Sequence, residues 1–177
     1  MSGMRRDQQL PVPTGPEAFV LAEGDRLLRA ARLLTGDWES GADLAQETLV
    51  RVWQAWGRIR DPHAARSYAH TTMVRLWYRT SKARRREIPM AEPREVGARA
   101  TGSELSQVVL DALGAIPAGQ RTALVLRYYL DLSVDDVAAV MRCSQGTVKS
   151  QTARGLAALR RDIQAHDQPK EAGDRDV

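Results

Sequence analysis

Apolar residues recur along most of this chain with the spacing of an α-helix, and no stretch shows the alternation that is typical of a β-strand. Turn-forming stretches such as TGDWES and IPAG separate one periodic segment from the next. We therefore predict an all-α protein. Helices are expected over residues 17–34, 40–56, 64–86, 105–115, 119–130, 133–141 and 144–163.

The periodic segments fall into two groups. Between them, residues 88–103 contain two prolines and no apolar stripe, a composition that favours a flexible linker. We expect two small helical domains, residues 17–87 and 104–164, on either side of it. Residues 1–16 and 165–177 mix proline, glycine and polar types without a period, and we expect both ends to be disordered.

The predicted helix 40–56 has one apolar and one polar side. Its apolar stripe consists of Ala45, Leu49, Val52, Trp53 and Trp56. Off that stripe lie Asp43, Gln46 and Glu47, which we expect at the surface. From the residues alone this polar side is either a docking surface or a plain solvated face.

The predicted helix 64–86 becomes strongly basic towards its end. We expect its inward positions to be Tyr68, Ala69, Thr72 and Leu76. A row along one side, which could follow a phosphate backbone, consists of Arg75, Arg79, Lys82 and Arg86. Trp77 and Tyr78 stand among these charges, where an aromatic ring can stack on a base, although core packing is expected for at least one of them.

The second half contains two short helices with strong N-terminal caps. Ser133 precedes VDD, and the spacing from Ser133 to Asp136 is that of a capping box. Ser144 is placed to accept from the backbone N–H near Thr147. Two short capped helices joined by the turn RCS predict a helix-turn-helix.

The second of these helices has the character of a helix that enters the major groove of DNA. A stripe of Val148, Thr152, Leu156 and Leu159 should face inward. Thr147, Ser150 and Arg154 should face outward; short side chains allow a close approach to bases, and arginine can contact guanine in a bidentate manner. Lys149 lies at the flank and suits a phosphate.

Composition restricts the classes of partner, cofactor and location that we expect for this protein. A formal charge of +4 and a pI of about 9.6 favour a polyanionic partner. With Cys143 as the single cysteine, no intramolecular disulfide is possible, and no zinc-site spacing occurs, so we expect neither metal nor cofactor. Since no segment suggests a membrane span or signal peptide, we expect a cytoplasmic protein without membrane insertion.

The stretch SVDDVAAVMRCSQGTVKSQTARGLAALR resembles region four of bacterial RNA polymerase sigma factors, particularly the extracytoplasmic-function (ECF) type and its actinobacterial SigE-like subfamily. The preceding ALGAIPAGQRTALVLRYYLDLS is also similar. Independently, DLAQETLVRVWQAW and the basic helix after it resemble region two of the same family. Together the likeness covers roughly residues 17 to 163.

The resemblance implies a subunit that binds core RNA polymerase and promoter DNA, with an anti-sigma factor as a further candidate partner. It implies that the polymerase contact is formed by Asp43, Gln46 and Glu47. It implies that the minus-thirty-five element is read by Ser144, Gln145, Thr147, Lys149, Ser150, Gln151 and Arg154. It implies that the minus-ten element is recognised and melted by Arg58, Arg60, Asp61, His63, Arg66, Arg75, Arg79, Lys82 and Arg86.

Three other functions compete with that of a sigma factor. A stand-alone DNA-binding regulator would explain the helix-turn-helix but not the polar helix and basic helix of the first half. An enzyme is disfavoured because no phosphate-cradling glycine loop, carboxylate pair or nucleophile with its base is recognisable. An interaction module that docks through the tryptophan-bearing helix 40–56 is compatible with the sigma-factor interpretation.

Overall fold

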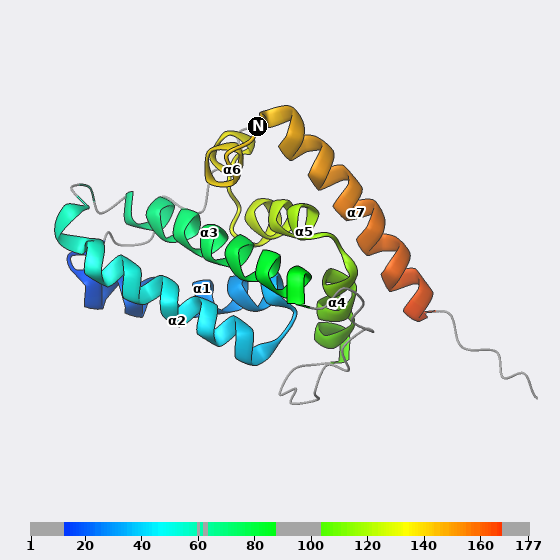
Figure 1. The fold of residues 1–177 in the computed structure, drawn as a ribbon, viewed down its shortest axis with the longest axis horizontal. Helices are drawn as coiled ribbons and strands as arrows, with labels where there is room; N and C mark the ends of the chain where they lie inside the picture. Colours follow the sequence, from blue (N-terminus) through cyan, green and yellow to red (C-terminus); the bar gives the residue numbers. More distant parts are fainter. Residues whose placement is uncertain (1–12, 60, 62–63, 88–103, 168–177) are drawn as a thin grey trace, which may run out of the picture.

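The computed structural model describes residues 13–59, 61, 64–87 and 104–167, and every regular element within these ranges is a helix (Figure 1). The all-α prediction is confirmed. The first half contains α1 (Pro16–Thr35), α2 (Trp38–Ala55), η2 (Trp56–Arg58) and α3 (Ala64–Glu87). The second half contains α4 (Glu104–Ala115), α5 (Ala118–Leu124), η3 (Val125–Tyr129), α6 (Val134–Met141) and α7 (Gln145–Asp167). The predicted linker lies outside the described residues.

Local capping explains where the helices begin and end. Gly36 ends α1 in the left-handed conformation with a φ of 71°, which glycine adopts at little cost. Asp37 then caps α2 by accepting from the Ser40 backbone N–H at 2.8 Å, so α2 begins two residues before the predicted start. The predicted capping box of Ser133 and Asp136 at the start of α6 is confirmed.

Helices α1, α2 and α3 form the first bundle, and α1 packs closely on α2 where Gly41 faces Arg32. A Cβ atom at Gly41 would lie 2.9 Å from the Arg32 Cα, so only glycine allows this approach. Two predicted core positions were wrong: Trp53 is 48% exposed and Tyr68 is 40% exposed. Each of these side chains lies beside an open cavity between two helices instead of against a third helix.

In the second half, α7 packs on α4, α5 and α6. Gly155 of α7 lies against Leu124 of α5, where an added Cβ would come within 3.0 Å of the leucine side chain. The expected single helix 119–130 is instead α5 followed by the π-helical turn η3, in which the Leu130 N–H donates to the Val125 carbonyl at 3.0 Å. Val148 of α7 is fully buried, as its place on the inward stripe predicted.

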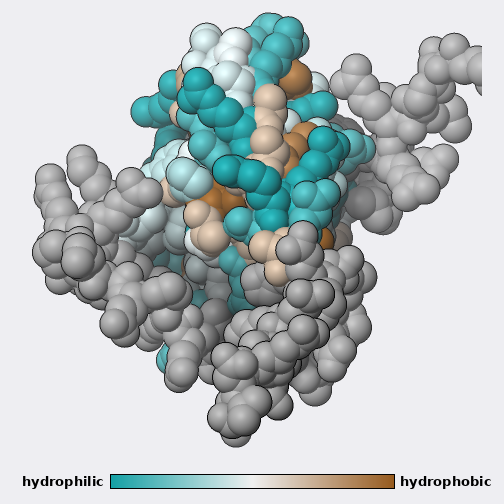
Figure 2. All heavy atoms as spheres, turned by 90° about the vertical axis from the view of Figure 1, so that its right-hand side faces the viewer, coloured by the Kyte–Doolittle hydropathy of each residue, from teal (hydrophilic) through white to brown (hydrophobic). Residues whose placement is uncertain are grey.

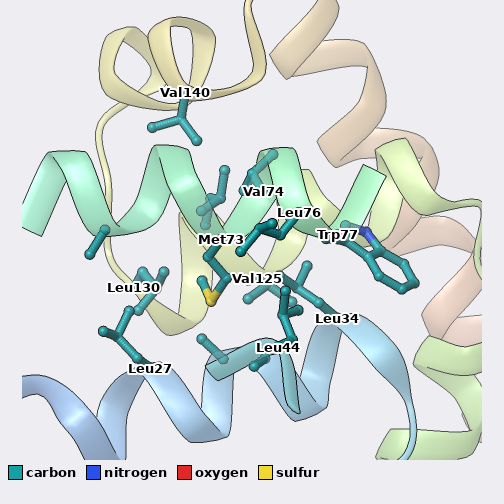
Figure 3. Packing of buried hydrophobic residues seen from close by; sticks show 14 of the residues in the cluster. Leu27, Leu34, Leu44, Met73, Val74, Leu76, Trp77, Val125, Leu130 and Val140 are labelled. Atoms are coloured by element: carbon teal, nitrogen blue, oxygen red, sulfur yellow. The ribbon is translucent and has the colours of Figure 1, made fainter. Parts of the chain in front are cut away.

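The two halves share one apolar core (Figure 3). Met73 and Val74 of α3 and Leu34 of α1 belong to the same cluster as Val125 and Val140 of the second half. In the figure, Val140 points from α6 towards α3, and Val125 lies beneath Met73. The two halves are therefore packed directly against each other, with α3 contacting both α5 and α6.

Across the described ranges, no helix is both long and apolar enough to cross a membrane. Within the same residues, no group of three or more His, Cys, Asp or Glu side chains could hold a metal ion.

Candidate nucleic-acid and polymerase interfaces

The start of α7 is fixed by side-chain hydrogen bonds. The Ser144 Oγ accepts from the Thr147 backbone N–H at 3.1 Å, as predicted, and lies 2.9 Å from the Thr147 hydroxyl. The Gln145 amide donates to the Asp135 carboxylate, which ties α7 to α6. The first turn of α7 is thus held in a fixed orientation relative to α6 before any ligand binds.

The outer face of α7 combines short polar and cationic side chains. Gln145, Lys149, Ser150 and Arg154 are all exposed. In the described part of the chain, neither Lys149 nor Arg154 forms an ion pair, so both cations are available to a ligand. Gln151 differs, because it is half-buried with its amide beside Gly119 of α5. The side of the molecule that carries α4 and α7 is largely hydrophilic, with scattered apolar residues (Figure 2).

A basic cavity of about 320 Å³ lies between α2, η2 and α3. Its lining consists of Arg51, Gln54, Ala55, Arg58, Tyr68, Thr72, Arg75, Leu76 and Arg79. In the structure as described, Arg58 and Arg75 form no ion pair, whereas Glu47 accepts from Arg51 at 2.7 Å and from Arg79 at 3.3 Å. The cavity therefore offers guanidinium groups for phosphates and a half-exposed aromatic ring for a base.

Two predicted site residues are committed to partners within the protein. Arg66 donates from Nε to the carboxylate of Glu23 at 2.6 Å, and the two side chains are only 17% and 2% exposed. Arg79 shares Glu47 with Arg51, so a residue assigned to DNA contacts one assigned to polymerase. We leave Arg66 out of the interface proposed below, because its cation neutralises a buried carboxylate.

Trp77 and Tyr78 both belong to the interior. Trp77 is 6% exposed, and Tyr78 is partly buried against the same cluster. Burial raises the pKa of the Tyr78 hydroxyl, and its hydrogen bond with Thr122 acts in the opposite direction. Core packing is therefore the role of both rings in this structure, and Tyr68 is the aromatic side chain that lines the basic cavity.

The polar side of α2 lies next to an exposed apolar groove. Asp43 and Gln46 are exposed, as expected from the helical pattern. Gln46 also lines a groove of about 830 Å³ between α1 and α2, together with Val20, Leu21, Gly24, Asp25, Leu28, Ala42, Ala45, Leu49, Val50, Trp53 and Gln54. Leu21 at the groove is 87% exposed, and Trp53 is 48% exposed. Such a surface is suited to a protein partner.

The remaining predicted site residues are placed as follows. Asp61 is exposed just before α3, and its backbone carbonyl accepts from Ala64 at 2.9 Å. Arg60 and His63 lie outside the described residues. Lys82 and Arg86 lie within α3, but their side chains also fall outside the described set.

Sequence reasoning missed Arg51, Gln54, Tyr68 and Thr72 as lining residues of the basic cavity. Arg51 and Gln54 are three residues apart on α2, a spacing that places them on one face. This spacing could have predicted that both polar side chains lie on the same side of α2. That they line the same cavity as Tyr68 and Thr72 depends on how α2 packs on α3. This packing cannot be deduced from a single sequence.

Comparison with known proteins assigns both halves to one family. Residues 19–87 match the model of sigma-70 region 2, and residues 106–159 match that of sigma-70 region 4. The chain is 33% identical over 165 residues to the RNA polymerase sigma-E factor of Streptomyces coelicolor, with 90% of this chain and 92% of that protein covered. It is 32% identical over 161 residues to the ECF RNA polymerase sigma factor SigC of Mycobacterium tuberculosis, with 85% and 84% covered.

A solved structure has the same fold. The sigma factor RpoE from Bartonella quintana, solved in complex with the anti-sigma factor NepR, matches with a TM-score of 0.71 at 24% sequence identity. The match covers 84% of this chain and 96% of that one.

These findings define a two-region transcription initiation factor, and the chain belongs to the sigma-70 family of RNA polymerase sigma factors. Among these it is an ECF sigma factor, related to the SigE proteins of Streptomyces. Its function is promoter-directed initiation of transcription together with core RNA polymerase.

Proposed function

We propose that this sigma factor works through three surfaces: α2 and its groove for core polymerase, the basic cavity for the melted minus-ten strand, and the outer face of α7 for the minus-thirty-five duplex. In this account the protein is a binding subunit that contributes no catalytic chemistry. We also propose that it acts in the cytoplasm, where it meets polymerase and promoter.

The basic cavity is the observation that carries this proposal. Melting a promoter exposes bases and phosphates on one strand, and unstacking a base costs a few kcal/mol. Arg58 and Arg75 supply charge for the phosphates, and a base stacked on Tyr68 would return about 1–3 kcal/mol. A plain solvated helix face would have neither the concave shape nor the aromatic ring.

The outer face of α7 supports recognition of duplex DNA. The fixed first turn places Ser150 and Arg154 on the exposed side, where Arg154 can reach guanine in the major groove. Lys149, exposed beside them, suits a backbone phosphate. The half-buried side chain of Gln151 lies beside Gly119 of α5, so we assign it to helix packing.

The exposed side of α2 supports docking on core polymerase. Gln46 supplies a polar group to an apolar groove that contains Trp53, and Asp43 is exposed on the same helix. An apolar centre with polar groups around it is common in protein interfaces. We extend the same surface to an anti-sigma factor. A protein that covered this groove would compete with polymerase directly.

The sharpest test of the minus-ten assignment compares two exposed tyrosines. Holoenzymes with Tyr68→Ala and with Tyr128→Ala are measured for binding to a library-selected promoter fragment whose minus-ten element is held open by mismatches. We expect Tyr68→Ala to weaken binding about tenfold through the lost stacking. Tyr128 is 61% exposed but lies in the second half, away from the cavity, so Tyr128→Ala should match wild type.

Equal affinities of the two variants would remove Tyr68 from the site. Binding of each variant to fully duplex minus-thirty-five DNA provides the internal control, because neither substitution touches α7.

A further inference from the structure

Asp135 is an acidic residue beside the outer face of α7. It is exposed in the first turn of α6, and its carboxylate accepts from the side-chain amide of Gln145 at the start of α7. The two helices pack on each other (Figure 1). The phosphates of a duplex bound to α7 repel a carboxylate in this position, because both groups are negatively charged. Asp135 therefore reduces the affinity for DNA of every sequence.

The start of α6 does not depend on Asp135. The Ser133 hydroxyl oxygen accepts from the Asp136 backbone N–H at 3.1 Å, and the Asp136 carboxylate accepts from the Ser133 backbone N–H at 3.3 Å. These two residues form the capping box of α6. In the described ranges, Asp135 takes part in no ion pair either. What remains for Asp135 is the favourable position of an acid in the first turn of a helix, and its hydrogen bond with Gln145.

Both partners of this hydrogen bond are held by packed helices. Val140 of α6 and Val148 of α7 are buried in one apolar cluster, so the two helices have a fixed relative position. On α7, Ser144 caps the first turn. The Gln145 side chain is therefore restrained at its backbone by the fold and at its amide by Asp135, which supports it from a second helix.

The hydrogen bond determines which atoms Gln145 presents to a ligand. A carboxylate only accepts hydrogen bonds, so the amide nitrogen of Gln145 faces Asp135 and the amide oxygen does not. Asp135 uses one N–H, which leaves the second N–H and the oxygen Oε1 for a base. Donation to an anion also strengthens Oε1 as an acceptor. Without Asp135 the amide group could turn over, which exchanges its donor and its acceptor.

One donor next to one strong acceptor is the pattern that adenine requires. In the major groove adenine presents the acceptor N7 beside its N6 amino group, and glutamine contacts both in a bidentate manner. Guanine presents two acceptors, so its O6 would face Oε1 of Gln145 and the negative charge of Asp135. Cytosine offers only a donor, and thymine offers only an acceptor. A glutamine held in this orientation therefore distinguishes adenine from the other three bases.

We propose that Gln145 reads an adenine of the minus-thirty-five element, and that Asp135 is the positioning residue that holds its amide in the orientation for adenine. This inference rests on the proposed role of the outer face of α7 in recognising that element. Asp135 touches no base and acts through Gln145. It lowers the affinity for DNA in general and raises the preference at one base pair.

The test uses holoenzymes formed from core polymerase and the full chain. Each binds a library with a randomised minus-thirty-five region and a constant minus-ten element, taken from a promoter that the wild-type holoenzyme transcribes, and the bound fragments are sequenced. We expect wild type to prefer adenine about tenfold at one position, and Gln145→Ala to abolish that preference. Asp135→Ala should reduce it to about twofold, with guanine gaining most, because a freely turning amide can donate to guanine.

Asp135→Asn is the matched control. Its side-chain oxygen can still accept from the Gln145 amide although the negative charge is lost, so the preference for adenine should be kept. Both Asp135 variants should bind DNA of every sequence more tightly, since each removes a charge that repels phosphates. If Asp135 served only the stability of α6, its loss would shift the unfolding midpoint and leave the base preference unchanged. The double variant Asp135→Ala with Gln145→Ala should have the base preference of Gln145→Ala alone.

The proposal is overturned if Asp135→Ala retains the wild-type preference, or if Asp135→Asn loses it as fully as Asp135→Ala does. The second result would show that the charge, and not the hydrogen bond, sets the preference. The proposal also fails if Gln145→Ala alters no position while Arg154→Ala does, a result that would leave the role of α7 intact. If neither of those two variants alters a base preference, the role of α7 in recognition fails as well, so the two failures are distinguishable.

Discussion

Arginines in this protein serve different purposes according to the groups that surround them. Arg66 neutralises the buried Glu23, and Arg121 bonds to carbonyls of both halves. Arg75 and Arg154 are exposed at the cavity and on α7. The family resemblance assigned Arg66 to the DNA surface with Arg75. Nothing in the sequence contradicted this assignment, because a buried partner such as Glu23, 43 residues away, leaves no local signal.

Recognition by α7 should divide into specific and non-specific contacts. We expect Arg154→Ala to change the preferred base at one or two positions of the minus-thirty-five element, because arginine contacts base edges. Lys149→Ala should weaken binding to all sequences alike and lower the salt dependence by about one unit of slope. A selection from random duplex DNA with each variant measures both effects. Equal losses of affinity on every sequence for both variants would contradict the division into specific and non-specific contacts.

The buried ion pair gives a stability prediction. Arg66→Met leaves Glu23 without its partner at a 2% exposed site, so we expect the free energy of unfolding to fall by about 3–5 kcal/mol. Arg75→Met, on the exposed side of the same helix, should alter it by less than about 0.5 kcal/mol. Urea unfolding of the two variants provides the comparison. If the Arg66→Met protein were as stable as wild type and lost only affinity for DNA, Arg66 would be a DNA-binding residue and not a structural one.

Local residue signals were the most predictable part of the structure. Ser133, Asp136 and Ser144 cap their helices as predicted, since each cap involves atoms three residues apart. Exposure of large aromatic residues was less predictable. Trp53 and Tyr68 have apolar neighbours at helical spacing, yet both lie at cavities whose walls come from a second helix.

At the scale of elements, α2 both packs within the first bundle and presents the exposed side that we propose for partner proteins. One side packs on α1 so closely that Gly41 is required opposite Arg32, and the other side presents Asp43 and Gln46. The helical period predicted the exposure of Asp43 and Gln46 correctly, but it wrongly placed Trp53 in the core. The groove beside Gln46 depends on the position of α1, so its shape could not be deduced from the α2 sequence.

The exposed side of α2 should carry affinity for polymerase. We expect the double variant Asp43→Ala with Gln46→Ala to bind core polymerase roughly tenfold more weakly, because truncation of an interface residue costs about 1 kcal/mol or more. Its circular dichroism and unfolding midpoint should equal those of wild type. Glu39→Ala, an exposed acidic position one turn earlier, is the control. A pull-down in which the double variant binds as well as the control would rule these two residues out of the contact.

At the scale of the whole molecule, the sequence predicted two all-helical halves, and family resemblance predicted their roles. It did not predict that Val74 and Val140, 66 residues apart, would belong to one core. Periodicity identifies which face of a helix is apolar, but not whether that face packs within its own half or on the other one. The packing of the two halves on each other therefore becomes known only from the three-dimensional structure.

The central claim is that this chain directs core RNA polymerase to promoters and opens them. The most direct measurement combines the purified protein with core polymerase on a GC-rich genomic promoter library, and scores run-off transcripts and permanganate-reactive thymines against core polymerase alone. We predict transcripts and melted thymines at the same promoters, both dependent on the protein. Duplex binding through α7 without polymerase association or melting would contradict the account and identify a stand-alone regulator instead.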